Sequence, residues 1–161
     1  MVNLSSFLKY HAQRWPENTA IVYEDSRISY GALWERVSQL ARFLSEQGIG
    51  KGDVVAVFMK NSPAFIEIAC ATSYLGAVFL PINYRLATDE VAYIVGNANA
   101  SLLIGDAEFD DILQVNIPKH VLSDAMQENI LDFTGVEDAI PEPCYLRPDD
   151  LFRLMYTSGT T

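Results

Sequence analysis

The chain has 161 residues, of which 50% are hydrophobic, so it can bury a core and is not a disordered protein. Its 11 basic and 21 acidic residues give a net charge of −10, which makes nucleic acid an unfavourable partner. The two cysteines form neither a disulfide framework nor a metal-ligand spacing, which favours a reducing, cytoplasmic location.

The N-terminal part of the chain is expected to form two helices separated by one short strand. Apolar residues recur at helical spacing over 4–11, and the run 19–23 is a strand candidate. Ser29 is placed to cap a second helix over 30–47, and Gly48 is placed to end it. No secretory signal pattern precedes these elements.

Two strand–helix–strand units are predicted next. In the first, strand 54–59 is a continuous apolar run typical of a strand buried on both faces, and a helix over 62–76 leads to strand 77–82. In the second, Thr88 is expected to be the N-cap of a helix that leads to strand 101–104. A weaker helix and a further strand are expected after them, at 108–115 and 120–122.

The chain is expected to divide into three parts within a single α/β domain. Residues 1–123 form the α/β core, and 124–150 form a solvated acidic connector with eight acidic residues against one basic residue, Arg147. Residues 151–161 form a strand that leads into a loop. The alternation of strands and helices predicts a three-layer α/β fold with a mostly parallel sheet and helices on both faces.

No segment is predicted to span a membrane. The most apolar window, 64–81, is interrupted too often by polar residues, glycine and proline.

The C-terminal run of small and hydroxyl residues is the candidate binding site. It follows the predicted strand 153–156, and ligands collect beyond the carboxyl ends of parallel strands. Small residues let the backbone approach phosphates, and N–H and O–H groups donate to them. An ordinary surface turn has a similar composition, and the run lacks the spacing and the lysine of a Walker-type loop. The residues concerned are Thr157, Ser158, Gly159, Thr160 and Thr161.

Five blocks of residues occur along the chain in the order found in a known family. They are 28–33, 48–56, 61–63, 74–86 and 149–161, the last ending in Tyr-Thr-Ser-Gly-Thr-Thr. The pattern resembles the adenylate-forming superfamily of acyl- and aryl-CoA synthetases, peptide-synthetase adenylation domains and firefly luciferases. The resemblance covers nearly the whole chain and implies the N-terminal part of the large domain of such an enzyme.

The resemblance also implies roles for the C-terminal run. In the family this block normally continues with Gly, a variable residue, Pro, Lys and Gly, and the loop holds the β- and γ-phosphates of ATP. It implies that Thr157, Ser158, Gly159, Thr160 and Thr161 contact the phosphates and that Thr157 is a candidate ligand of the Mg²⁺ bound to ATP. No catalytic residue is expected within this chain.

The implied activity is that of an ATP-dependent acyl-CoA synthetase acting on a fatty or aromatic acid. A carboxylate would attack the α-phosphate of ATP to give an acyl-adenylate, and the thiol of coenzyme A would then displace AMP. The chain alone is expected to be inactive, because the family places its adenine site, acyl pocket and mobile C-terminal domain downstream. The expected partners are ATP, coenzyme A, the carboxylate and the remainder of its own chain, and a homodimer is left open.

Two alternatives remain. The first is an adenylation domain that loads a carrier protein instead of coenzyme A, although the stretch 80–86 favours the fatty-acyl and aromatic-acyl ligases. The second is a non-catalytic α/β binding module for which the Ser/Thr/Gly run is an ordinary chain end.

Several other polar residues are expected to be structural. His11 and His120 have no base or metal partner in their neighbourhood, and Lys51 and Lys60 are expected to face solvent. In the turn after strand 77–82, Asn83 is expected to bond local backbone and Arg85 to tie down a carbonyl or carboxylate.

Overall fold

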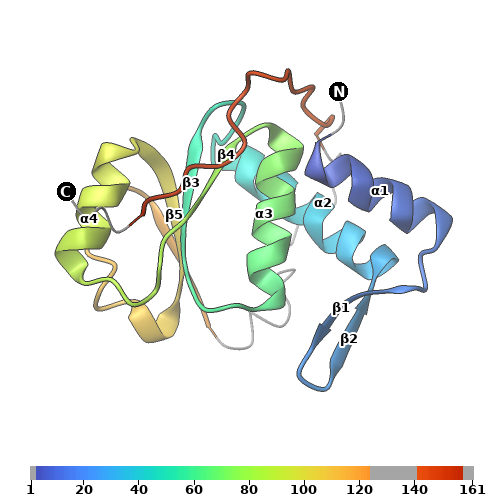
Figure 1. The fold of residues 1–161 in the computed structure, drawn as a ribbon, viewed down its shortest axis with the longest axis horizontal. Coiled ribbons are helices and arrows are strands. Elements are labelled where there is room, and N and C mark those ends of the chain that lie inside the picture. The colour runs from blue at the N-terminus through green and yellow to red at the C-terminus, as the bar shows by residue number, and fades with distance from the viewer. Residues whose placement is uncertain (1–2, 124–140, 158–161) are drawn as a thin grey trace.

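A four-stranded parallel sheet lies at the centre of the protein, in a computed structural model that describes residues 3–123 and 141–157 (Figure 1). Its strands are β3 (Val54–Phe58), β4 (Val78–Pro81), β5 (Ala100–Asp106) and β6 (Lys119–Leu122). They lie in the order β4-β3-β5-β6, and every neighbouring pair is parallel. The predicted parallel sheet is confirmed.

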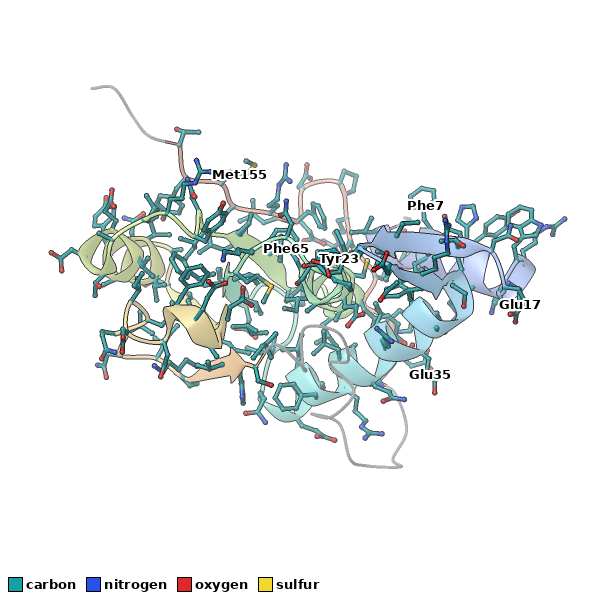
Figure 2. The ribbon with its side chains drawn as sticks, turned by 90° about the horizontal axis from the view of Figure 1, so that it is seen from below. Phe7, Glu17, Tyr23, Glu35, Phe65 and Met155 are labelled. Carbon is teal, nitrogen blue, oxygen red and sulfur yellow. The ribbon has the colours of Figure 1, made fainter. Side chains whose placement is uncertain are left out.

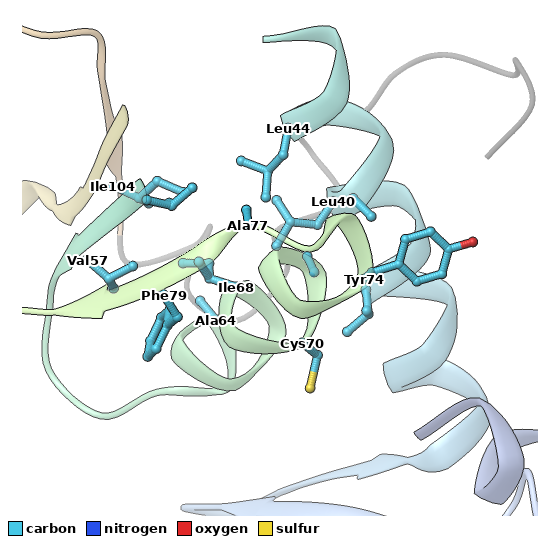
Figure 3. Close-up of a cluster of buried hydrophobic side chains, with 14 of the residues drawn as sticks. Leu40, Leu44, Val57, Ala64, Ile68, Cys70, Tyr74, Ala77, Phe79 and Ile104 are labelled. Carbon is cyan, nitrogen blue, oxygen red and sulfur yellow. The ribbon is translucent and has the colours of Figure 1, made fainter. Parts of the chain in front are cut away.

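Helices cover both faces of this sheet. They are α1 (Leu4–Arg14), α2 (Tyr30–Glu46), α3 (Pro63–Leu75) and α4 (Thr88–Asn97). Alternate residues of a strand point to opposite faces. Val55 and Val57 pack on one face in a cluster that includes residues of α2 and α3. Figure 3 shows Val57 in this cluster, together with Leu44 of α2 and Ile68 of α3. Val54, Ala56 and Phe58 pack on the other face with the buried residues of α4. The three-layer α/β fold is therefore confirmed.

The strand predicted at 19–23 forms, but it does not join the parallel sheet. It is β1 (Thr19–Tyr23), which pairs antiparallel with β2 (Ser26–Ser29) in a separate hairpin. Figure 1 shows this hairpin projecting beyond α1 and α2. Strand β2 was not predicted, because Arg27 and the short polar turn before it interrupt the alternation of apolar and polar residues.

Local capping signals predicted two helix ends correctly. The Ser29 hydroxyl accepts a hydrogen bond from the Ala32 N–H at 3.3 Å and begins α2. Gly76 has a φ of 71° and ends α3 in the left-handed conformation that glycine favours. The cap predicted at Thr88 is wrong by one residue: Ala87 is the N-cap, and its N–H donates to Glu90 Oε2 at 2.8 Å.

The helix predicted at 108–115 is also wrong. Only a 3₁₀ turn forms there, η1 (Ala107–Phe109). Leu113 is fully buried, and a Cβ on Gly105 would lie 2.4 Å from its Cδ1 atom. Burial of this one side chain against β5 overrides the weak helical pattern, as tertiary contacts often do.

The chain returns to the sheet as an extended C-terminal segment, defined here as residues 150–157. It lies beside β4, where Phe79 N–H donates to Phe152 O at 3.0 Å and Leu154 N–H donates to Phe79 O at 3.1 Å. The strand predicted at 153–156 is therefore realised only as one parallel bridge, at Arg153. The next residue of β4 on this side is Pro81, which has no N–H to extend the ladder.

Candidate functional site

A hollow of about 630 Å³ lies at the carboxyl end of β4, between α4 and the end of the C-terminal segment. Ligands of parallel α/β sheets collect at this end of the strands. Its walls come from three parts of the chain, including Pro81, Asn83, Asp89, Tyr93, Tyr156 and Thr157. This hollow is the candidate site, and Thr157 is the sequence-predicted residue that lies in it.

The C-terminal segment is fixed at its start by Asp150. Its Oδ2 atom lies 2.6 Å from Lys51 Nζ and also accepts the Arg147 N–H at 2.6 Å. These donors, the Arg147 N–H first and Lys51 second, hold the pKa of the Asp150 carboxyl below its usual value. Lys51 is exposed, as expected, and it also pairs with a residue 99 positions away.

The same segment is fixed at its end by Tyr156. The Tyr156 hydroxyl donates a hydrogen bond to Oδ1 of Asn97, the last residue of α4. Between the two ends, Leu154 packs against the core cluster that contains α4, whereas Met155 is 62% exposed. Figure 2 shows Met155 at the outer edge of the molecule. The contacts of Asp150 and Tyr156 therefore fix the path of the C-terminal segment up to Thr157.

Only one of the five predicted phosphate contacts belongs to the described part of the chain. Thr157 is exposed and lines the hollow. The other four lie outside the described residues, so their roles stay predictions: Ser158, Gly159, Thr160 and Thr161.

The described wall of the hollow carries acidic rather than basic side chains. Asp89 and Glu90 occupy the first turn of α4, where carboxylates stabilise the helix dipole. Their place in the same hollow as Thr157 depends on the fold. The carboxylates of this wall would repel a phosphate, whereas the Asn83 amide and the Tyr93 and Thr157 hydroxyls in the same lining can donate hydrogen bonds.

The turn after β4 is structural in part. Asn83 Oδ1 accepts the Arg85 N–H at 3.1 Å, which confirms the expected local bond. The Arg85 guanidinium was expected to hold a carbonyl or carboxylate. It lies instead 5.6 Å from the centre of the Tyr84 ring, in a cation–π contact.

A second polar cluster lies at the carboxyl ends of β3 and β5. Fully buried Asp106 accepts the Lys60 N–H at 2.9 Å, and Lys60 Nζ lies 2.7 Å from Glu108 Oε2. The hydrogen bond to Glu108 raises the pKa of Lys60. The Phe109 ring stacks on Tyr84 and lies 5.6 Å below Lys60 Nζ. Lys60 is therefore exposed, as expected, and it also links the end of β3 to the end of β5 through its bond to Asp106.

The histidines and cysteines lie away from the hollow. His11 stacks on Tyr30 with ring centres 5.0 Å apart, and His120 packs edge-on against Phe43, where burial lowers its pKa. Cys70 and Cys144 are free thiols, and burial raises the pKa of Cys70 to about 12. These contacts are those of packing residues.

Residues 3–123 and 141–157 contain no group of three or more His, Cys, Asp or Glu side chains that could hold a metal ion. None of their helices is both long enough and apolar enough to cross a membrane.

Residues 8–161 match the sequence profile of the family described as AMP-binding enzyme. The chain belongs to this adenylate-forming family. The match includes the C-terminal segment and Thr157, and it confirms the resemblance drawn from the five ordered blocks.

Individual relatives are similar along almost the whole chain. The 2-succinylbenzoate–CoA ligase of Geobacillus sp. (strain WCH70) is 35% identical over 161 residues, 99% of this chain and 31% of that protein. Tyrocidine synthase 2 of Brevibacillus parabrevis is 31% identical over 93% of this chain and 4% of that protein. A solved fatty acyl CoA synthetase of Mycobacterium tuberculosis has a TM-score of 0.81 and 28% identity, covering 97% of this chain and 32% of that one. The chain thus spans about a third of the length of the CoA ligases it matches.

Proposed function

We propose that this chain is the N-terminal part of an ATP-dependent, AMP-forming acyl-CoA ligase. The enzyme activates a carboxylate as its acyl-adenylate and transfers the acyl group to coenzyme A. The observation that carries the proposal is the 35% identity to a CoA ligase over 161 residues, with the C-terminal segment included. The geometry supports it, since that segment brings Thr157 to the carboxyl edge of a parallel sheet.

The phosphate-binding role falls to the run that begins at Thr157. Its hydroxyl and backbone N–H groups donate to the β- and γ-phosphates of ATP, and the acidic wall of the hollow keeps those phosphates on the side of the run. The residues proposed for this role are Thr157, Ser158, Gly159, Thr160 and Thr161.

A magnesium ion fits Thr157 as a single protein ligand. Mg²⁺ prefers oxygen ligands and is commonly held by few protein groups together with substrate phosphates. The exposed Thr157 hydroxyl suits this use, and no cluster of three acidic, His or Cys side chains occurs in 3–123 or 141–157. When bound, the ion neutralises charge on the phosphates.

We propose a fatty or aromatic acid as the substrate class, because the solved relative is a fatty acyl CoA synthetase and the curated one acts on 2-succinylbenzoate. The remainder of the protein supplies the acyl pocket. A cytoplasmic location fits the two free thiols.

A carrier-protein acceptor is the second candidate. It is favoured by the 31% identity to Tyrocidine synthase 2, in which the matched region is 4% of a much longer protein. The fold is compatible with either acceptor, because the acceptor is bound by parts that follow this chain.

The test is an assay of the complete protein with a panel of carboxylates. We expect acid-dependent exchange of pyrophosphate into ATP, followed by AMP release and a thioester when coenzyme A is added. Thioester formation only on a carrier protein would favour the second candidate. Absence of exchange with every acid would support a non-catalytic module and contradict both.

The chain of residues 1–161 serves as the matched control. We expect it to show no exchange, because the proposal assigns the adenine site and the acyl pocket to the remainder of the protein. Exchange by 1–161 alone would show that this assignment is wrong.

A further inference from the structure

The C-terminal segment loses its backbone support just before the predicted phosphate contacts begin. Its last described backbone hydrogen bond to the sheet is that of Leu154 N–H to Phe79 O. Pro81, the next residue of β4 on this side, lacks an N–H and so cannot donate to the segment. Met155 is 62% exposed and so adds little packing.

One side-chain contact replaces this support. The Tyr156 hydroxyl donates to Asn97 Oδ1, across 59 positions of the chain. Asn97 ends α4, and α4 is anchored in the core by Val91, Ile94 and Val95. The hydrogen bond therefore ties the residue next to Thr157 to a rigid element.

We propose that Tyr156 and Asn97 are positioning residues of the phosphate loop, a role that rests on the function proposed above. Their hydrogen bond determines where Thr157 leaves the sheet edge. Without it, binding of ATP has to order the end of the segment, which costs conformational entropy. The loss is expected in the affinity for ATP, since the phosphate donors themselves are unchanged.

The experiment measures ATP–pyrophosphate exchange in the complete enzyme, with KM for ATP, KM for the acid and kcat determined separately. The variants are Tyr156→Phe and Asn97→Ala, which remove the donor and the acceptor, and the double variant. We expect each single variant to raise KM for ATP about fivefold, the size typical of one lost neutral hydrogen bond. The KM for the acid and kcat should change less than about twofold.

Two further variants separate positioning from a general structural effect. Asn97→Gln retains an amide oxygen and should restore KM for ATP to within about twofold of the wild type. Tyr145→Phe removes a hydroxyl from a tyrosine that is 71% exposed and does not line the hollow, and it should leave KM unchanged. Thermal melting of each variant shows whether it is folded at the assay temperature.

The double variant gives the sharpest result. If the two residues act as one pair, its KM for ATP should match that of either single variant. The proposal would be overturned if the single variants left KM for ATP unchanged, or if the double variant raised it by the product of the two single effects. It would also be overturned if Asn97→Gln did not restore KM for ATP. A wild-type enzyme without any exchange would instead overturn the proposed function, and the positioning role would fall with it.

Discussion

Strand β3 lies inside the parallel sheet and the C-terminal segment lies at its edge beside β4, and different forces hold the two in place. All five residues of β3 are buried, and it pairs with β4 and β5 along its length. The C-terminal segment pairs at Arg153 alone, and most of its side chains are exposed. The scaffold thus depends on apolar burial, whereas the segment that leads to the candidate site depends on a few polar contacts. Segments with few buried contacts open most readily, which suits the nucleotide-binding role proposed for the run that begins at Thr157.

Matched phenylalanine substitutions should separate the two regions most strongly. Phe58 of β3 is fully buried, and Phe58→Ala is expected to lower the free energy of unfolding by about 3–5 kcal/mol. Phe152 in the C-terminal segment is 40% exposed, and Phe152→Ala should cost less than about 2 kcal/mol. Urea unfolding of the 1–161 chain measures both, and equal losses would contradict the contrast.

A matched glycine pair tests packing at the edge of the core. A Cβ on Gly105 would lie 2.4 Å from Leu113 Cδ1 and 3.1 Å from the Phe58 carbonyl oxygen, so Gly105→Ala should cost about 1–3 kcal/mol. At Gly96 in α4 a Cβ meets nothing within 4 Å, and Gly96→Ala should stabilise by up to about 1 kcal/mol. Thermal unfolding checks both signs, and destabilisation by both substitutions would show that the helix tolerates no change at this end.

A buried carboxyl should give the core its own pH dependence. Glu67 is fully buried and lies 3.3 Å from Arg36. Burial raises its pKa above 4.5, with Arg36 opposing the effect, so its contribution to stability is present below that pH. It is lost as the pH rises through the folded-state pKa. We expect the difference in unfolding free energy between wild type and Glu67→Gln to shift against the wild type as the pH rises. An unchanged difference from acid to neutral pH would contradict this.

The partly exposed carboxyl of Asp150, in the C-terminal segment, should contribute to stability with the opposite pH dependence. The pKa of Asp150 is held below 3.8 by the Arg147 N–H and Lys51, so its contribution is present above that pH and is lost as the pH falls through the folded-state pKa. Asp150→Asn should hardly change global stability, but it should speed hydrogen exchange of the Leu154 N–H. Lys51→Met should act in the same direction and more weakly. Exchange at wild-type rates in both variants would show that the bridge to β4 holds without this anchor.

Prediction succeeded where the signal was local or was repeated along the chain. The apolar run 54–59 favoured a strand buried on both faces, and Gly76 favoured a helix end. It failed where contacts between distant residues matter. The predicted helix 108–115 forms only a 3₁₀ turn, with Leu113 packed close to Gly105, and the predicted last strand forms a single bridge at Arg153.

The candidate site was predictable only in its chemistry. The five ordered blocks predicted the family, which the profile match confirms. Phosphate binding by the hydroxyl-rich run stays a prediction. The acidic wall and the Tyr156–Asn97 bond could not be foreseen, because 59 positions separate these two residues along the chain.

Residue patterns alone predicted the alternation of helices and strands, the start of α2, the end of α3, the three-layer class and the family, because periodicity, capping and motif order are properties of short stretches. Tertiary structure alone decided that β1 leaves the main sheet and that the C-terminal segment lies beside β4. It also decided that Thr157 faces a hollow formed with α4. Those outcomes depend on which distant groups remain free to donate, accept or pack once the core has formed.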